Sequence, residues 1–339
     1  MMDNNRNAFI LTMLVCFFLV PFLYLWSSFD IPNKGPFAIL FFPASGKLIH
    51  ERGVLLALPI LICTCFFAYR DSMRANLARI GVLCYYFHAV YAIIPRFPQI
   101  LKFYEENPLL KLFKFSLPGI LFLILILFAL YYSIRSIPLD KISTDLFENV
   151  SKKSTTRLLI FGIVTFCLPM IIIFFCHVSD IESLLSLNNF VYHFVYLNVM
   201  HFAGRMALPF SFLSPEIRFG VVVPLLGIAA YLLSKNRVAG YLMTPILLVK
   251  EAIPFLTFFH PQYYMWFMRH SIFEMIQIIA AHLGIGKNKE IISSDAFLDY
   301  FTRFFSIDLG HLLFIIFTTC CFIYSILYLA KMKEIDTAK

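Results

Sequence analysis

Long apolar runs, each close to the thickness of a lipid bilayer, constrain this chain more than any other feature. Eight runs are strong candidates for membrane spans: 8–29, 53–69, 80–94, 115–134, 158–176, 219–233, 241–259 and 308–330. A helix needs ~20 predominantly apolar residues to cross the hydrocarbon core. Only 14% of the residues are charged, whereas a soluble domain has about 25%. The sequence therefore predicts an all-α polytopic integral membrane protein, with residues 1–339 forming a single multi-pass transmembrane domain.

Two further segments, 188–212 and 269–284, are marginal as spans because each carries several ionisable residues. The prediction is thus a bundle of 8–10 transmembrane helices with possible re-entrant or broken segments. If the two marginal segments do not cross, they belong to the outer face. Counting Lys and Arg near the span ends puts both termini in the cytoplasm with eight or with ten spans, so charge alone does not separate the two arrangements.

The net charge of +8 is interpreted as loop charge of a plasma (bacterial inner) membrane protein, not as a nucleic-acid surface. A basic turn is predicted between the second and third spans, with Arg70, Arg74 and Arg79. All eight cysteines fall within apolar runs and none forms a C-x-x-C pair, which indicates small buried hydrophobic residues. Neither a metal site nor a cofactor is predicted.

The segment 188–212 contains a stripe of ionisable residues. His193, His201 and Arg205 recur at multiples of four positions, so a helix would place them on one side. Such residues are costly at membrane depth and need water, a partner charge or a ligand. The stripe is either a set of hydrogen bonds between helices or an anion site, with Arg205 binding the anion and a histidine acting in proton transfer.

A second candidate is the pair Lys250–Glu251, bracketed by Pro245 and Pro254. Neighbouring helix positions point about 100° apart, so the two side chains are not expected to face one another. The prolines predict a kink or an unwound stretch, and broken membrane helices often line a site. Glu251 is instead expected to meet Arg205 or Arg269 in a buried ion pair.

A third candidate is the stripe formed by His270, Glu274 and Gln277. The spacing His-x-x-x-Glu provides two potential metal ligands but not the H-E-x-x-H pattern, and two ligands do not make a site. Proton handling or hydrogen bonding between helices is the favoured interpretation of this stripe.

Two short strings resemble segments of known families. Gln262–Trp266 resembles a Q-Y-x-x-W patch of polytopic mannosyltransferases that use lipid-linked sugars, and this resemblance implies a catalytic acid such as Asp30 or Glu51. Phe41–Ile49 resembles the F-F-x-x-S-G segment of the polytopic acyltransferase-3 family. That family carries a histidine in its first span, whereas residues 8–29 contain none.

The leading hypothesis is a membrane-embedded transferase acting on a lipid-linked or amphipathic anionic substrate near the outer face. Its catalytic residues would be Glu251, Glu274 and His201, and its substrate-binding residues Arg205, Lys250, His193 and His270. One alternative is a secondary transporter or proton-coupled permease with a midplane site at the broken helix 245–254. Another is a non-catalytic subunit of a membrane complex. The expected partners are the lipid bilayer, a lipid-linked substrate and other membrane proteins.

Overall fold

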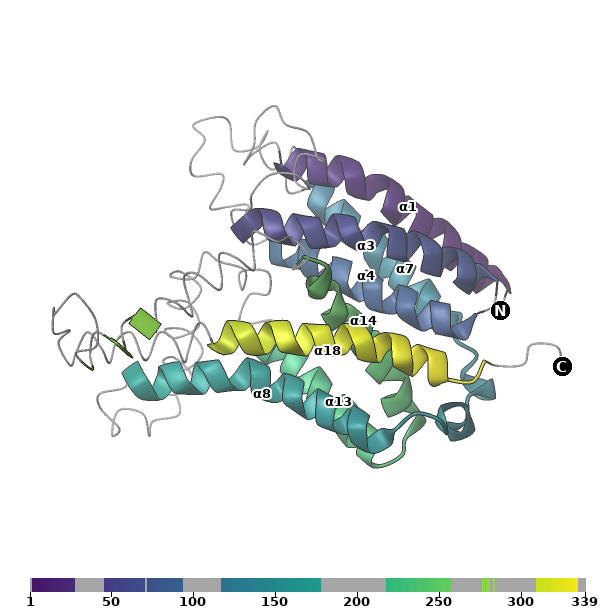
Figure 1. Ribbon diagram of the computed structural model, residues 1–339. Coiled ribbons are helices and arrows are strands. Elements are labelled where there is room, and N and C mark those ends of the chain that lie inside the picture. The colour runs from purple at the N-terminus through teal and green to yellow at the C-terminus, as the bar shows by residue number, and fades with distance from the viewer. Residues whose placement is uncertain are drawn as a thin grey trace, which may run out of the picture.

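The computed structural model describes residues 2–27, 46–70, 72–93, 117–177, 218–257 and 309–334, with a few positions between 276 and 283. These residues are helical and contain no strand, which confirms the predicted all-α class (Figure 1). The main helices of this part are α1 (Met2–Ser27), α3 (Gly46–Tyr69), α4 (Met73–Ile93), α7 (Leu117–Arg135), α8 (Lys152–His177), α13 (Val223–Ser234), α14 (Val238–Thr257) and α18 (Leu309–Lys331).

These helices occupy the segments in which the sequence predicts strong spans. Within the part of the chain that the structure describes, four stretches are long and apolar enough to cross a bilayer: Asp3–Pro21, Gly119–Lys141, Val238–Leu256 and Leu312–Lys331. Large apolar side chains also cover the outside of the bundle, for example Phe17 (71% exposed), Leu121 (56%) and Tyr231 (62%). Contiguous apolar surface of this kind is unfavourable in water. The composition therefore suggests a bilayer environment, and the crossing of each helix remains a prediction.

The helices form two groups of four. Helices α1, α3, α4 and α7 pack together, as do α8, α13, α14 and α18. Each group has a buried hydrophobic cluster, and α4 and α14 contribute to both clusters. The two groups meet where α14 packs against α3 and α4. Helix α14 is thus the central element, with neighbours in both groups.

Successive main helices run in opposite directions, so the described ends of the chain, near Met2 and Glu334, lie at the same end of the bundle (Figure 1). We call this the terminal end and the other the distal end. The connections at the terminal end are the tight turns 70–72 and 235–237 and the longer loop 136–151. The segments 28–45, 94–116, 178–217 and 258–308 connect helices at the distal end, apart from the π-helical turn Arg218–Val222 that leads into α13.

The direction of the helices bears on the number of spans. Helix α8 ends and α13 begins at the distal end, and the same is true of α14 and α18 (Figure 1). These helix directions are compatible with eight spans. Both the eight-span and the ten-span arrangement stay predictions, because 188–212 and most of 269–284 lie outside the described residues.

The turn between α13 and α14 is fixed by local geometry. Asn236 has φ 56°, the left-handed conformation that asparagine tolerates, and its Oδ1 accepts a hydrogen bond from Tyr241 Oη at 2.6 Å. A Cβ atom on Gly240 would lie 2.4 Å from the backbone nitrogen of Leu233. Only glycine permits this close approach, so the turn holds the start of α14 tightly against the end of α13.

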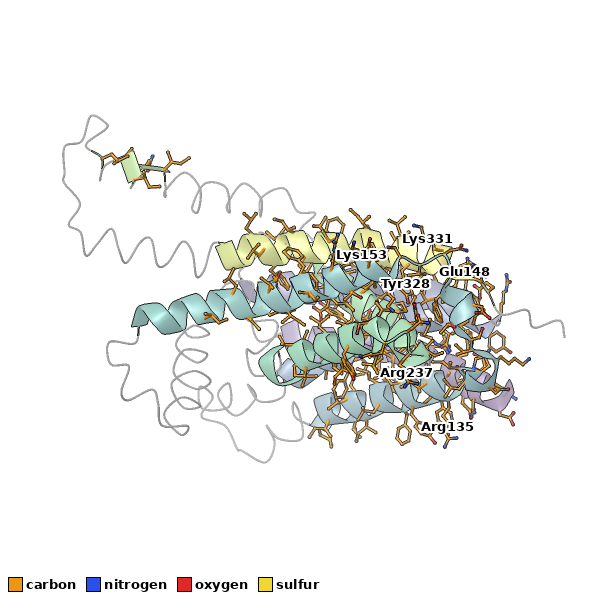
Figure 2. The ribbon with its side chains drawn as sticks, turned by 90° about the horizontal axis from the view of Figure 1, so that it is seen from below. Arg135, Glu148, Lys153, Arg237, Tyr328 and Lys331 are labelled. Atoms are coloured by element: carbon orange, nitrogen blue, oxygen red, sulfur yellow. The ribbon has the colours of Figure 1, made fainter. Side chains whose placement is uncertain are left out.

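Basic side chains surround the terminal end. Arg135, Lys153, Arg237 and Lys331 all lie there (Figure 2). Glu148 forms an ion pair with Lys333, in which Oε2 and Nζ are 2.8 Å apart. The connection 136–151 also contributes Phe147, which is buried and stacks on the Tyr241 ring with a centroid separation of 4.9 Å. These contacts attach the loop before α8 to the start of α14 and to the end of α18.

Candidate functional site

The candidate site that the structure describes is the pair Lys250–Glu251 on α14. Both side chains are buried, Lys250 with 8% and Glu251 with 1% of its surface exposed. Lys250 lies about 18 Å along a helix that rises 1.5 Å per residue, so the pair is in the half of α14 nearer the distal end. The central helix of the bundle therefore carries two buried charges.

Lys250 Nζ donates a short hydrogen bond to Glu251 Oε1, and the two side chains form an ion pair. The prediction that these adjacent side chains would not meet is wrong. The Cβ directions do diverge, but the four-methylene stem of lysine is long enough to carry the ammonium group back to the neighbouring carboxylate. The two charges compensate one another, which buried charges require.

Helices α4 and α18 enclose the pair. The charge of Glu251 reaches Tyr85 of α4 and Cys321 of α18, and the charge of Lys250 reaches Cys84. Helix α4 comes this close because of Gly81, where a Cβ atom would lie 2.8 Å from Ile246 O and from Val249 Cβ on α14. The pair thus lies where α4, α14 and α18 pack together, with a phenol and two thiols within reach of its charges.

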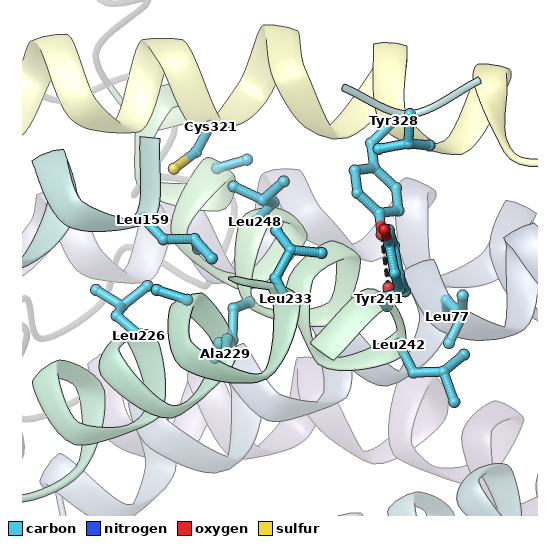
Figure 3. Close-up of a cluster of buried hydrophobic side chains, with 14 of the residues drawn as sticks. Leu77, Leu159, Leu226, Ala229, Leu233, Tyr241, Leu242, Leu248, Cys321 and Tyr328 are labelled. Atoms are coloured by element: carbon cyan, nitrogen blue, oxygen red, sulfur yellow. Dashed lines mark hydrogen bonds between the residues drawn. The ribbon is translucent and has the colours of Figure 1, made fainter. Parts of the chain in front are cut away.

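Both prolines that bracket the pair lie inside a continuous helix, so the predicted unwound stretch at 245–254 is wrong. Pro245 has no N–H, which leaves the carbonyl four residues earlier, that of Tyr241, without a helical donor. Tyr328 of α18 supplies the missing hydrogen, because its Oη donates to Tyr241 O at 2.7 Å (Figure 3). A neighbouring helix therefore satisfies the carbonyl, and α14 stays intact.

Pro254 has the same effect nine residues further along α14. It deprives the carbonyl of Lys250 of its helical donor. The Lys250–Glu251 ion pair therefore lies one helical turn before an internal proline of α14.

The other predicted site residues lie outside the described residues: His193, His201, Arg205, His270, Glu274 and the proposed partner Arg269. The structure therefore brings together Lys250 and Glu251 and leaves the two stripes as predictions. It does place the points where their segments join the bundle. Residues 178–217 and 258–308 connect helix ends at the distal end (Figure 1). Lys250 and Glu251 lie in the half of α14 that is nearer this end.

One buried charge was not anticipated. Arg79 was predicted to belong to a basic turn, but it lies in the second turn of α4 with no exposed surface. Its Nη2 donates to Asn76 Oδ1 at 2.7 Å. The apolar positions Met73, Leu77 and Ile80, spaced three or four residues apart, are the signal that could have extended the helix through Arg79.

Metal ligands do not gather in the part of the chain that the structure describes: no three His, Cys, Asp or Glu side chains there are placed to hold an ion. The cysteines whose side chains are described carry free thiols. Comparison of the chain with protein-family models, with curated proteins and with solved structures finds no match.

Proposed function

We propose that this protein is a multi-pass enzyme of the plasma membrane that transfers a group to or from a lipid-linked or amphipathic anionic substrate. The observation that carries the proposal is the difference between the two ends of the bundle. Two of the three connections at the terminal end, 70–72 and 235–237, are tight turns, whereas each distal connection is longer than any at the terminal end. Functional residues concentrate on long connections held by a rigid scaffold, and both predicted stripes belong to distal connections.

The sidedness follows from charge. Exposed basic residues such as Arg135, Lys153 and Arg237 lie at the terminal end (Figure 2). Lys and Arg near the ends of spans favour the cytoplasmic side. We therefore place the termini in the cytoplasm and the distal end, with its candidate chemistry, at the outer face.

The Lys250–Glu251 pair gives the proposal a mechanism. A phosphate or carboxylate of the substrate competes with Glu251 for the Lys250 ammonium. When the substrate takes this position, the Glu251 carboxylate is released and becomes a general base for the attacking hydroxyl group. Arg205, His193 and His270 would hold the remainder of the anionic group, while Glu274 and His201 would share the proton transfer. The closed ion pair is then the resting state of the site.

Single replacements test this function. Membranes from cells expressing Glu251→Gln, Glu274→Gln, His201→Gln or Arg205→Gln are compared with wild type for their lipid and glycan products. Glu148→Gln and Glu334→Gln are matched controls, because both carboxylates are exposed at the terminal end. Loss of one product class in the first set and not in the controls is expected. Wild-type products in all four distal variants would refute the transferase.

Protein abundance must be separated from activity, because Glu251→Gln leaves Lys250 charged and unpaired in the bundle. The double variant Lys250→Met/Glu251→Gln removes both charges and avoids this penalty. We expect it to accumulate to near wild-type levels and to remain inactive. An active double variant would show that the pair is structural.

One observation favours a second candidate function, a proton-coupled permease. Charged residues buried in a membrane bundle often belong to proton relays or substrate pathways, and Lys250 and Glu251 are both buried. Since α14 is continuous, the site would be the pair itself and not a broken helix. Substrate flux into proteoliposomes that Glu251→Gln abolishes, with unchanged lipids, would favour the permease. If the protein gives neither products nor flux and copurifies with fixed partners, the remaining interpretation is a non-catalytic subunit.

A further inference from the structure

Arg79 is a buried cation that has no counter-charge among the described residues. It is among the largest side chains that are fully buried in the described residues. Its Nη2 donates to Asn76 Oδ1, but Nε and Nη1 are buried and have no hydrogen-bond partner. No described carboxylate forms an ion pair with it, since the described pairs join Glu334 to Arg74, Glu251 to Lys250 and Glu148 to Lys333.

The surroundings of Arg79 are polar but neutral. Asn76 Nδ2 donates to Ser133 O on α7 at 3.2 Å, and Thr12 of α1 donates to its own helix. The Cys65 thiol of α3 lies beside the guanidinium, and its hydrogen points to Phe9 O at 3.7 Å. The thiol sulfur is a weak acceptor for the guanidinium, whereas Nε and Nη1 have no hydrogen-bond partner among the described residues.

A guanidinium stays protonated in proteins, so its charge cannot be removed by loss of a proton. The Cys65 side chain is buried as well, and the loss of hydration disfavours a thiolate there. A buried charge needs a partner of opposite sign and acceptors for its donors. The first helix group, α1, α3, α4 and α7, offers the charge and two free donors, and no described residue there offers the anion.

We propose that Arg79 binds a small monovalent inorganic anion of the chloride type within the first helix group. The site has one full positive charge and few further donors, which suits a small monovalent anion better than a phosphate. Arg79 lies only about 9 Å along α4 from Met73. Asn76 Nδ2 also donates to Ser136 Oγ at 3.0 Å, and Ser136 is half-buried at the end of α7. Polar groups thus connect Arg79 to the terminal end.

The test uses the full chain purified in detergent and follows thermal unfolding. Sodium chloride is titrated against sodium gluconate at constant ionic strength, because gluconate is too large for such a site. The wild type is expected to show a saturable rise in Tm of about 2–4 °C with chloride. Arg79→Met is expected to lose this rise. Arg74→Met is the matched control, since Arg74 lies in the first turn of α4 and pairs with Glu334.

Asn76→Asp keeps the test decisive if Arg79→Met fails to fold. It places a carboxylate where Asn76 Oδ1 now contacts Nη2, so it supplies the counter-charge from within and should abolish the chloride effect. Cys65→Ser should keep the effect, because the thiol is not the counter-charge. The proposal is overturned if chloride and gluconate act alike on the wild type. It is equally overturned if Asn76→Asp or Arg79→Met retains the full chloride effect.

Discussion

Tyr328 donates its hydroxyl hydrogen to the backbone carbonyl of Tyr241 at 2.7 Å, across the contact between α18 and α14. That carbonyl is the acceptor that Pro245 leaves without a helical donor. The side chain of one helix thus replaces the backbone hydrogen bond that another helix lacks. This contact explains how α14, which carries the candidate site, continues through an internal proline.

Removing the Tyr328 hydroxyl is expected to destabilise the protein. Tyr328→Phe leaves a buried carbonyl unsatisfied, which costs about 1–3 kcal/mol, measured as the free energy of unfolding in mixed micelles. Tyr231→Phe is the control, because Tyr231 is exposed. Pro245→Ala restores the N–H donor and should make Tyr328→Phe nearly neutral. Equal costs of Tyr328→Phe with and without Pro245 would show that the two are unrelated.

The buried ion pair predicts a strong coupling between Lys250 and Glu251. Lys250→Met or Glu251→Gln alone leaves one buried charge unpaired and should cost about 3–5 kcal/mol. The double variant should cost much less than the sum of the single changes. The same cycle on the exposed pair Lys333–Glu148 should show almost no coupling. Additive effects at 250 and 251 would contradict the pairing.

Gly81 predicts how sensitive the contact between α4 and α14 is to one methyl group. In Gly81→Ala the added Cβ would lie 2.8 Å from Ile246 O and Val249 Cβ, and such overpacking costs about 1–3 kcal/mol. Gly227→Ala is the control in α13, since the nearest atom to its Cβ would be 3.9 Å away. Unfolding of both variants should show loss of stability only at position 81. A neutral Gly81→Ala would mean that α4 sits further from α14.

The pair Glu148–Lys333 predicts a weak pH dependence at the terminal end. The hydrogen bond from Lys333, together with its charge, lowers the pKa of Glu148 from 4.5, and Glu148 raises the pKa of Lys333 from 10.5. The Glu148 contribution is therefore present above pH 4.5 and is lost as pH falls through its lowered pKa. The Lys333 contribution is present below pH 10.5 and is lost as pH rises through its raised pKa.

This dependence is measured as the difference in Tm between wild type and Glu148→Gln. The difference should be greatest in the neutral range, vanish in acid and shrink with added salt, because both side chains are exposed. A difference that persists unchanged in strong acid would show that Glu148 acts through something other than its charge.

The helices could be predicted from the sequence because length and apolarity alone determine where a membrane helix can form. Their starts could not: α4 begins at Met73, before the apolar run, so Arg79 enters the helix. The direction of each helix could not be predicted either, because it depends on how the helices pack. Charge counts left eight and ten spans open, whereas the packing of α8 against α13 and of α14 against α18 places the connected helix ends on one side.

The candidate site was predictable in its residues but not in its geometry. Lys250 and Glu251 stand out as charges in an apolar run. The angle of about 100° between neighbouring helix positions, taken alone, predicts that their side chains do not meet. The flexible stem of lysine decided the pairing. Likewise, prolines predict a broken helix only when no neighbour replaces the lost hydrogen bond. The hydroxyl of Tyr328 is 83 positions from Pro245 in the chain, and no local pattern reveals their contact.

The sidedness of three introduced cysteines tests most directly whether the polar segments share the outer face. Asn188→Cys, Lys287→Cys and Lys235→Cys are made singly in a chain whose eight native cysteines are replaced by alanine. Intact cells are then treated with a membrane-impermeant maleimide. Positions 188 and 287 should react from outside, and position 235 only after permeabilisation. Reaction of 188 and 287 from opposite sides, or of both together with 235, would contradict a single functional face opposite the termini.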